Sequence, residues 1–470
     1  MSRIAVVGAG PAGCVATQRL VTAGHSVVLF EQGVGIDGSA AARSSASFSD
    51  ALKETQLLDH SSFVTDVGDH ALPYLRGRGV GGSSAVNAMA QTWGCPDDYN
   101  QWERAYGCTG WGWSSVRQEF QNLHMGSSRA VEAGRFSRAV VEAALRMGAS
   151  EVQHGAGCGD GAGTVALSLV DGKRLDTFSA FVLPLLRDAN TAALLEVRTE
   201  CSVEAVLMEG GVAKGLVLGD GSEEQFDAVV MCAGAVWSPL LLLRSGLFGP
   251  AIGRNLQDHP SLSIIVQMAQ SVEETLPEVT SLVIASSAMG ESNIHLLPVN
   301  ATSNGSGMQF AQLVAAVTQV SSRGSVKEVD LRAELSLRSL TTDADAEAMR
   351  AAIILASDVL APLKENGLVV ECYVDNAGTR LHELLAHDQA SMARFVQRQL
   401  GAYSHVSGTC AMGASESDHA AVSTSGAVFN TQRLWVADAS VFPDIPRGAT
   451  QLPTMMVASR IARGVAQQLS

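Results

Sequence analysis

The sequence predicts an α/β fold in which a Rossmann-like domain is joined to an α+β domain built on an antiparallel sheet. Three observations lead to this prediction. Residues 3–31 contain an apolar strand, a glycine-rich turn, a helix and a second strand in immediate succession. Two later strands, at residues 228–233 and 434–437, are each followed directly by a turn. Residues 264–320 contain three further segments that we interpret as antiparallel strands.

The N-terminal unit has the pattern of a dinucleotide-binding motif. The first strand is predicted over residues 3–7, the helix continues to about Ala23, and the second strand ends at Glu31. The turn between the first strand and the helix is GAGPAG, from Gly8 to Gly13. Glycines at this spacing, within a strand, turn, helix and strand followed by an acid, are typical of domains that bind FAD or NAD.

Each residue of this turn has an expected role. Gly8 permits the tight turn, Gly10 lets the backbone approach a pyrophosphate, and Gly13 lets the helix pack closely on the sheet. Pro11 and Ala12 open the helix, whose N-terminal end faces the phosphates with the positive end of its dipole. The turn is therefore predicted to bind a dinucleotide cofactor.

Glu31 is predicted to accept hydrogen bonds from the adenosine ribose of that cofactor. It stands eighteen residues beyond Gly13, at the end of the second strand. Its negative charge disfavours a 2′-phosphate, which argues against NADP.

Later elements follow from local patterns. Residues 195–218 alternate apolar and polar around Glu209-Gly210-Gly211, which predicts a hairpin. After the strand at 228–233, Ser238 is predicted to cap a helix that has Pro239 in its first position.

Strands are predicted at residues 264–270, 295–299 and 309–320. A helix that includes Met349 to Leu360 is predicted to end at Pro362, and Asp388 is predicted to cap a helix running to about Leu400. These strands and helices are the basis of the predicted second domain.

Five further motifs occur in a fixed order along the chain. They are RGRGVGGSSAVNA (76–88), GAVWSPLLLLRSGL (234–247), GRNLQDH (253–259), SHVSGTCAMG (404–413) and LWVADASVFPDIP (434–446). Together with the N-terminal turn, they resemble the glucose–methanol–choline (GMC) family of FAD oxidoreductases. The resemblance extends from residue 4 to about residue 465.

The resemblance implies the GMC oxidoreductase fold with bound FAD. The Rossmann-like FAD-binding domain is expected to be discontinuous and to comprise residues 1–160, 194–258 and 428–470. The substrate-binding domain is expected to comprise residues 161–193 and 259–427. The Ser/Ala-rich stretch at 38–49 is predicted to be a loop over the cofactor.

The family motifs also indicate which residues bind FAD. Val203 is the expected neighbour of the adenine, and the Asp438-Ala439 turn is expected near the flavin and pyrophosphate, although Asp438 is equally compatible with a purely structural cap. Val86 stands where some family members carry a histidine bonded covalently to the flavin, so FAD is predicted to be non-covalent. The other expected cofactor residues are Arg78, Gly79, Gly82, Ser83, Ser84, Asn87, Ala88, Ala233, Gln451 and Leu452.

His405 is the predicted general base. It matches the family's histidine beside the flavin, and an imidazole suits removal of the hydroxyl proton while a hydride moves to flavin N5. A second His or Asn usually follows in the family, but the aligned residue here is Ala449, which has no side-chain donor. Gln451, the nearest amide, is the predicted replacement. We predict no metal site.

Three classes of function remain open from the sequence. The first is FAD-dependent oxidation of a CH–OH group in a small alcohol-type substrate, with O2 or a redox carrier as electron acceptor. The second is a lyase-like or otherwise divergent family member, possibly biosynthetic, in which FAD is structural or the usual partner is replaced by Ala449. The third is a non-redox partner protein that binds FAD.

Composition excludes other functions. The chain has 470 residues and a formal net charge of −15, which makes nucleic acid an unfavourable partner. No apolar run approaches the roughly 20 residues of a membrane span. Eight single cysteines without a CxxC pair, and no N-terminal signal, predict a reduced, cytoplasmic protein.

Overall fold

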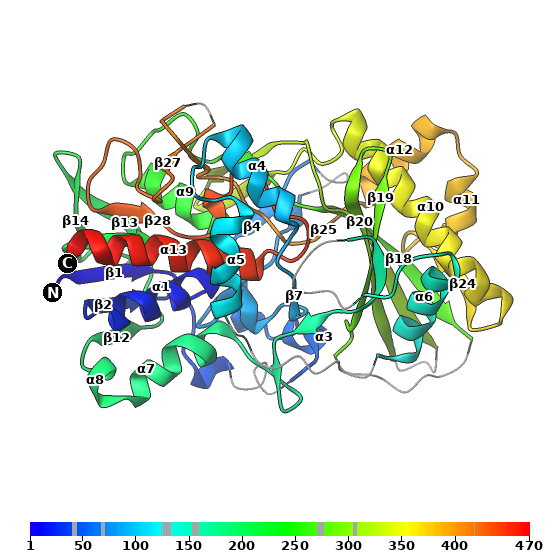
Figure 1. Cartoon of the computed structure of the whole chain (residues 1–470), viewed down its shortest axis with the longest axis horizontal. Helices are drawn as coiled ribbons and strands as arrows, with labels where there is room; N and C mark the ends of the chain where they lie inside the picture. Colours follow the sequence, from blue (N-terminus) through cyan, green and yellow to red (C-terminus); the bar gives the residue numbers. More distant parts are fainter. Residues whose placement is uncertain are drawn as a thin grey trace.

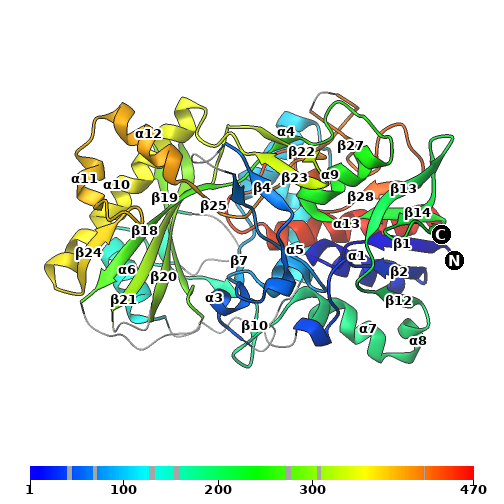
Figure 2. The ribbon, with the colours of Figure 1, turned by 180° about the vertical axis from the view of Figure 1, so that it is seen from behind.

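The computed structural model describes residues 1–39, 45–66, 71–123, 125, 133–152, 159–269, 277–303, 308–417 and 419–470. The molecule is elongated, and a parallel sheet and a larger antiparallel sheet lie toward its opposite ends (Figure 1). Both termini lie at the end that carries the parallel sheet (Figures 1 and 2). The middle of the predicted loop at 38–49 lies outside the described residues.

The parallel sheet is assembled from distant parts of the chain. Its five strands in spatial order are β12 (Leu195–Arg198), β2 (Ser26–Phe30), β1 (Arg3–Val7), β16 (Ala228–Met231) and β28 (Leu434–Val436). The three segments predicted to form one domain therefore all contribute strands to one sheet. Helix α1 (Pro11–Thr22) follows β1 and packs against α13 (Gln451–Leu469), the last helix.

The antiparallel sheet has a core face and an open face. Its main strands are β24 (Val369–Tyr373), β18 (Pro260–Met268), β21 (Gln309–Val317), β20 (Gly290–Ser303), β19 (Ser281–Ser287) and β8 (Gly161–Thr164). Alternate residues such as Ile264, Leu296 and Leu313 pack in one core with helix α10 (Asp343–Glu365) and α6 (Arg135–Arg146). Since side chains alternate along a strand, the intervening residues face the other way.

Smaller elements connect these two sheets. A third sheet consists of β17 (Arg254–Leu256), β22 (Gly324–Val329), β23 (Arg332–Ser336), β4 (Ser62–Val64) and β5 (Leu72–Pro73), and a hairpin sheet of β13 (Val203–Glu209), β14 (Val212–Leu218) and β15 (Glu223–Gln225). Further helices are α3 (Phe48–Ala51), α4 (Pro96–Tyr106), α5 (Trp113–Asn122), α7 (Leu183–Arg187), α8 (Ala189–Ala192), α9 (Gly234–Arg244), α11 (Leu381–Leu385) and α12 (Gln389–Gln399). None of the helices in the described ranges is long and apolar enough to cross a membrane.

Several predicted elements are confirmed. The N-terminal strand, helix and strand have the expected positions, and the hairpin turns at Glu209–Val212. Residues 195–198, however, leave the hairpin and join the parallel sheet as β12. Asp388 caps α12 by accepting a hydrogen bond from the backbone N–H of Ser391, as predicted.

Two predicted helix boundaries are wrong because a proline is tolerated inside each helix. Helix α9 begins at Gly234, so Pro239 lies within it; the hydroxyl of Thr409 donates to the carbonyl of Ala235, four residues before the proline, at 2.6 Å. Pro362 likewise lies inside α10, which continues for another turn to Glu365. A proline only removes one hydrogen bond of its helix, and a side chain can replace it.

The prediction that all cysteines are reduced is wrong for Cys95, which is disulfide-bonded. The thiols of Cys14, Cys108, Cys201, Cys232, Cys372 and Cys410 are free. Cys158 lies outside the described residues. The cysteines stand singly along the chain, so the sequence gave no signal that any two of them form a disulfide. A disulfide depends on the distance between two cysteines in the fold and not on their spacing along the chain.

Candidate active site

A cavity of about 1250 Å³ is lined by residues of both the parallel and the antiparallel sheet. Most of the predicted site residues line it: Gly8, Gly10, Pro11, Ala12, Glu31, Gly82, Ser83, Asn87, Ala88, Val203, Ala233, His405, Asp438, Ala439 and Gln451. Gly13, Arg78, Gly79, Ser84 and Leu452 do not line it. Residues spread over more than 400 positions of sequence thus meet around one elongated space.

The glycine turn leaves no room for side chains. A Cβ on Gly13 would lie 1.8 Å from the carbonyl oxygen of Gly8, and a Cβ on Gly82 would lie 2.7 Å from the Cα of Gly10. Gly8 itself has a φ of 101°, which disfavours any L side chain. Gly13 therefore serves the close packing of α1, while Gly10 and Gly82 bring two backbones together at the cavity wall.

Glu31 joins three segments of backbone around the cavity. Its carboxylate accepts hydrogen bonds from the N–H groups of Ala9 at 3.0 Å, Gly33 at 2.9 Å and Gly79 at 2.9 Å. The side chain is buried and also lines the cavity. Glu31 thus positions the glycine turn and the loop at Gly79 whether or not a ribose is present.

The predicted residues outside the cavity support its wall. The hydroxyl of Ser84 donates to the carbonyl of Gly81 at 2.5 Å and lies 2.9 Å from the hydroxyl of Thr177. Arg78 donates to the carbonyl of Gln32 at 3.3 Å. Leu452 lies in the first turn of α13 and is buried in the core.

Asn87 connects the glycine-rich loop to helix α13. Its Nδ2 donates to Oε1 of Gln451 at 2.6 Å. Beneath the loop, the buried guanidinium of Arg174 donates through Nη1 to the carbonyl of Asn87 at 2.6 Å and to its Oδ1 at 3.0 Å. Burial lowers the pKa of Arg174 to about 10, so this side chain stays charged near neutral pH. Arg174 was not predicted, because no local pattern distinguishes it from a surface arginine.

Asp438 has a structural role that the sequence left open. Its carboxylate accepts hydrogen bonds from the N–H of Gly234 at 2.8 Å, the hydroxyl of Ser238 at 2.5 Å and the N–H of Ser440 at 2.8 Å. Burial raises its pKa, and these hydrogen bonds oppose the rise. The carboxylate therefore joins the start of α9 to the Asp438-Ala439 turn, which itself lines the cavity.

His405 is held beside a second histidine. The Nδ1 atoms of His405 and His259 lie 2.9 Å apart, so that one ring donates to the other. His259 is fully buried, and this burial together with the charge of His405 holds the pKa of His259 well below its usual value. Both rings are therefore neutral near neutral pH, and the Nε2 atom of His405 is not used by His259.

Asp258 fixes the backbone of both histidines. Its Oδ1 accepts hydrogen bonds from the N–H of His405 and of His259, each at 2.8 Å, and its Oδ2 accepts one from the hydroxyl of Tyr74 at 2.7 Å. Asp258 and His259 belong to the GRNLQDH motif, but no local pattern in the sequence indicates a role for either residue.

Arg76 stabilises the unusual backbone just before His405. Ser404 has a φ of 62°, and the Arg76 guanidinium donates to its carbonyl at 2.5 Å. Burial, together with the electrostatic influence of Arg76 and His295, lowers the pKa of His405 to about 3.

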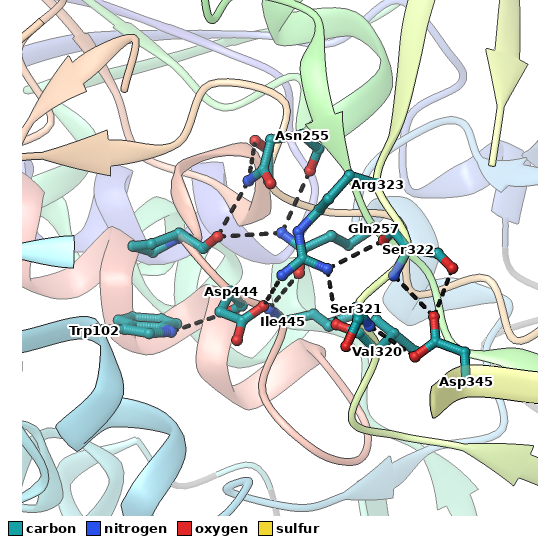
Figure 3. Close-up of polar contacts among 12 residues, drawn as sticks. Trp102, Asn255, Gln257, Val320, Ser321, Ser322, Arg323, Asp345, Asp444 and Ile445 are labelled. Atoms are coloured by element: carbon teal, nitrogen blue, oxygen red, sulfur yellow. Dashed lines mark hydrogen bonds and ion pairs between the residues drawn. The ribbon is translucent and has the colours of Figure 1, made fainter. Parts of the chain in front are cut away.

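A polar network holds the loop that leads to Ala449 against the strand that leads to His259 (Figure 3). Gln257 donates to the carbonyl of Pro443 at 3.2 Å and accepts from the N–H of Ile445 at 3.0 Å. Asn255 donates to the same carbonyl at 3.1 Å. The GRNLQDH motif thus holds in place both the loop that leads to Ala449 and the strand that leads to His259.

Asp444 extends this network to two other elements. Its carboxylate pairs with Arg323 at 2.6 Å, and its carbonyl accepts from the indole of Trp102 at 2.9 Å (Figure 3). Burial raises the pKa of Asp444 to about 6 although Arg323 opposes the rise.

The open face of the antiparallel sheet forms the far wall of the cavity. Its contribution comes from β18, β19, β20 and β21, and includes Ser261, Ser263, Ile265, Leu282, His295, Leu297, Val299, Gln312 and Val314. Among the described residues that these strands contribute, none is an acid, a lysine or an arginine. This wall suits an uncharged, largely apolar group.

Models of the GMC oxidoreductase family match residues 3–261 and 320–458 of the chain. Among curated proteins, 5-(hydroxymethyl)furfural oxidase from Methylovorus sp. is 27% identical over 84% of this chain and 83% of that protein. Mitochondrial choline dehydrogenase from Mus musculus is 28% identical over 97% and 88%.

Solved structures agree on the fold. Pyridoxine 4-oxidase from Mesorbium loti superposes with a TM-score of 0.84 at 24% identity, covering 99% of both chains. Formate oxidase from Aspergillus oryzae superposes with a TM-score of 0.85 at 19% identity, covering 99% of this chain and 98% of that one. The predicted fold class is therefore confirmed.

Proposed function

Because the chain belongs to the GMC oxidoreductase family, we propose that it uses FAD to oxidise a CH–OH group and that His405 takes the hydroxyl proton. FAD, when bound, supplies the acceptor for the hydride. The observation that carries the proposal is His405 in the wall of the cavity, with its Nδ1 atom engaged by His259.

The cavity fits FAD by three of its features. A Cβ on Gly8 would lie 2.6 Å from the carbonyl oxygen of Cys232 and one on Gly82 would lie 2.7 Å from the Cα of Gly10, so bare backbone forms this part of the cavity wall. Helix α1 begins at Pro11, which lines the cavity together with Gly10 and Ala12, so its N-terminal end lies at the cavity, as a pyrophosphate requires. In addition, Nε2 of Gln451 is a buried donor without a partner among the described residues, and Asn87 fixes the amide so that this donor is presented. We assign Gln451 to the cofactor.

We propose that FAD is held without a covalent bond. Val86 is buried and lines the cavity at the position where the family resemblance would place a flavin-linked histidine. A hydrocarbon side chain offers no atom for such a bond.

His405 is arranged to accept a proton at Nε2. If Nδ1 of His405 donates to Nδ1 of His259, then Nε2 carries a lone pair toward the cavity. An alcohol has too high a pKa to lose its proton alone, so the proton passes to Nε2 as the hydride leaves the carbon. Asp258 and Arg76 keep the ring in place through the backbone on both sides of His405.

The substrate is proposed to be a neutral alcohol with an apolar body. The sheet wall offers Ile265, Leu297, Val299 and Val314 but no carboxylate that could pair with a cation. Two of the relatives are named for choline and 5-(hydroxymethyl)furfural, respectively a charged and a neutral alcohol. The sheet wall of the cavity therefore favours a neutral alcohol.

Anaerobic mixing of the FAD-loaded protein with benzyl alcohol or with choline tests this proposal. Benzyl alcohol is expected to bleach the flavin absorbance, whereas choline should leave it largely unchanged, because the sheet wall offers no carboxylate to pair with a buried cation. Bleaching by choline but not by benzyl alcohol would overturn the proposed substrate class. Failure of every alcohol in a broad panel would overturn alcohol oxidation itself.

The pH dependence of flavin reduction follows from the low pKa of His405, which is lowered from 6.5 to about 3. A base acts in its deprotonated form, so a lowered pKa makes His405 competent at all higher pH values. We expect the anaerobic rate to stay level from about pH 5 to 8, as followed by stopped-flow absorbance. An acidic limb with its midpoint near the ordinary histidine value would contradict this assignment.

A further inference from the structure

Ala449 leaves one side of the substrate oxygen without a side-chain donor. Its methyl group lines the cavity that His405 also lines, and its backbone N–H is used by the hydroxyl of Thr92 at 2.8 Å. A hydroxyl oxygen that loses its proton develops negative charge, and a positioned donor at that atom is usually needed to stabilise it. The question is which side chain supplies this donor.

His295 reaches the position of Ala449 from the opposite domain. A Cβ built on Gly448 would lie 3.5 Å from Cε1 of His295 and 2.6 Å from Oγ1 of Thr92. The imidazole of His295 is therefore packed against the residue that immediately precedes Ala449. Both ring nitrogens of an imidazole are bonded to Cε1, so a nitrogen of His295 also lies near this point.

The strand that carries His295 is rigid and aims it at the cavity. His295 lies in β20 and pairs with Ile284 of β19 and Ala316 of β21, so its backbone is fixed on both sides. Its side chain is 3% exposed and lines the cavity, as do Leu297 and Val299 at alternate positions of the same strand.

His295 and His405 approach the same space from two directions. They come from different elements, both line the cavity, and they are close enough for the charge of His295 to lower the pKa of His405. A substrate hydroxyl between them would meet a base on one side and a donor on the other.

The two other polar side chains near Ala449 are already engaged. Oε1 of Gln451 accepts from Asn87, and its Nε2 is the buried donor that we assign to the cofactor. Oγ1 of Thr92 accepts from the N–H of Ala449. Both side chains therefore have other roles at this site.

We propose that His295 donates a hydrogen bond to the substrate oxygen and replaces the donor that Ala449 lacks, an inference that rests on the proposed alcohol oxidation. The alcohol C–H bond breaks with its electron pair leaving as hydride, the O–H proton moves to His405, and a C=O bond forms. His295 keeps its own proton throughout and stabilises the negative charge on the oxygen.

The test uses His295→Leu and His295→Gln in the FAD-loaded protein, with benzyl alcohol as the probe. His295→Leu is expected to slow anaerobic flavin reduction by about 10²–10³-fold, whereas His295→Gln, which keeps an N–H donor, should lose about tenfold or less. His382→Leu, the same change at an exposed histidine of α11 outside the cavity, is the matched control and should leave the rate nearly unchanged.

Two further readouts separate a donor from a merely structural residue. His295→Leu should weaken binding of benzaldehyde to the oxidised protein by about 2- to 10-fold in calorimetry, as expected for one lost neutral hydrogen bond. Adding Ala449→Asn to His295→Leu should restore part of the rate, because it returns a donor to the vacant side.

A wild-type rate in His295→Leu would overturn the proposal while leaving alcohol oxidation intact. So would equal losses in the Leu and Gln variants with unchanged benzaldehyde affinity and no repair by Ala449→Asn. Large losses in Gln451→Ala or Thr92→Val with none in His295→Leu would assign the donor elsewhere. If no alcohol reduces the flavin of the unaltered protein, both this inference and the proposed function fail.

Discussion

His405→Ala is expected to slow anaerobic flavin reduction by about 10²–10⁴-fold, the usual contribution of a positioned general base. The backbone around His405 is held by Asp258 and Arg76, whose bonds use main-chain atoms that alanine keeps. The variant should therefore fold and retain FAD, so that the loss appears in the chemical step. Stopped-flow absorbance with saturating benzyl alcohol measures it.

His382→Ala is a suitable control, because His382 is an exposed histidine on α11 outside the cavity. It should reduce its flavin at the unaltered rate. If His405→Ala does the same with a normal flavin spectrum, then His405 is not the base and the proposed mechanism is wrong.

The Glu31→Ala variant is expected to lose most of its bound FAD. The change removes the acceptor of three backbone N–H groups, at Ala9, Gly33 and Gly79. Each buried donor left without a partner costs about 1–3 kcal/mol, so the cavity wall loses about 3 kcal/mol or more. A loss of that size corresponds to FAD binding weakened by about 10²-fold or more.

Flavin occupancy after gel filtration and acid precipitation measures this effect. Glu209→Ala, which removes an exposed acid at the turn between β13 and β14, should leave occupancy unchanged. Equal occupancy in Glu31→Ala and the unaltered protein would show that Glu31 neither organises the wall nor contacts the ribose. The same acid step should release all flavin into the supernatant if Val86 precludes a covalent bond.

Sequence patterns predicted correctly those strands and helices whose structure depends on neighbouring residues alone. The strand, turn and helix at residues 3–22 follow from apolar spacing and from glycines that no other residue can replace. Helix α9 was misplaced because the hydroxyl that replaces the hydrogen bond lost at Pro239 comes from Thr409, far along the chain. Such compensation depends on the tertiary structure.

In the candidate site, too, the sequence predicted only those residues that a local motif identifies. His405 belongs to a motif whose residues lie next to one another in the sequence, so its position could be inferred. His259 acts through a contact across 146 positions, and His295 lies in a strand, β20, where no local motif marks it as a site residue. Only the register of β20 between β19 and β21 shows that His295 faces the cavity and not the core.

Anaerobic mixing of the FAD-loaded protein with benzyl alcohol and with its α,α-dideuterated form tests the central claim most directly, when absorbance and product are followed together. We expect the flavin to bleach, one benzaldehyde to form for each flavin reduced, and deuterium at the carbon to slow both processes equally. Product formation with an unchanged flavin spectrum would contradict oxidation by the flavin and support the lyase-like alternative, in which FAD is structural.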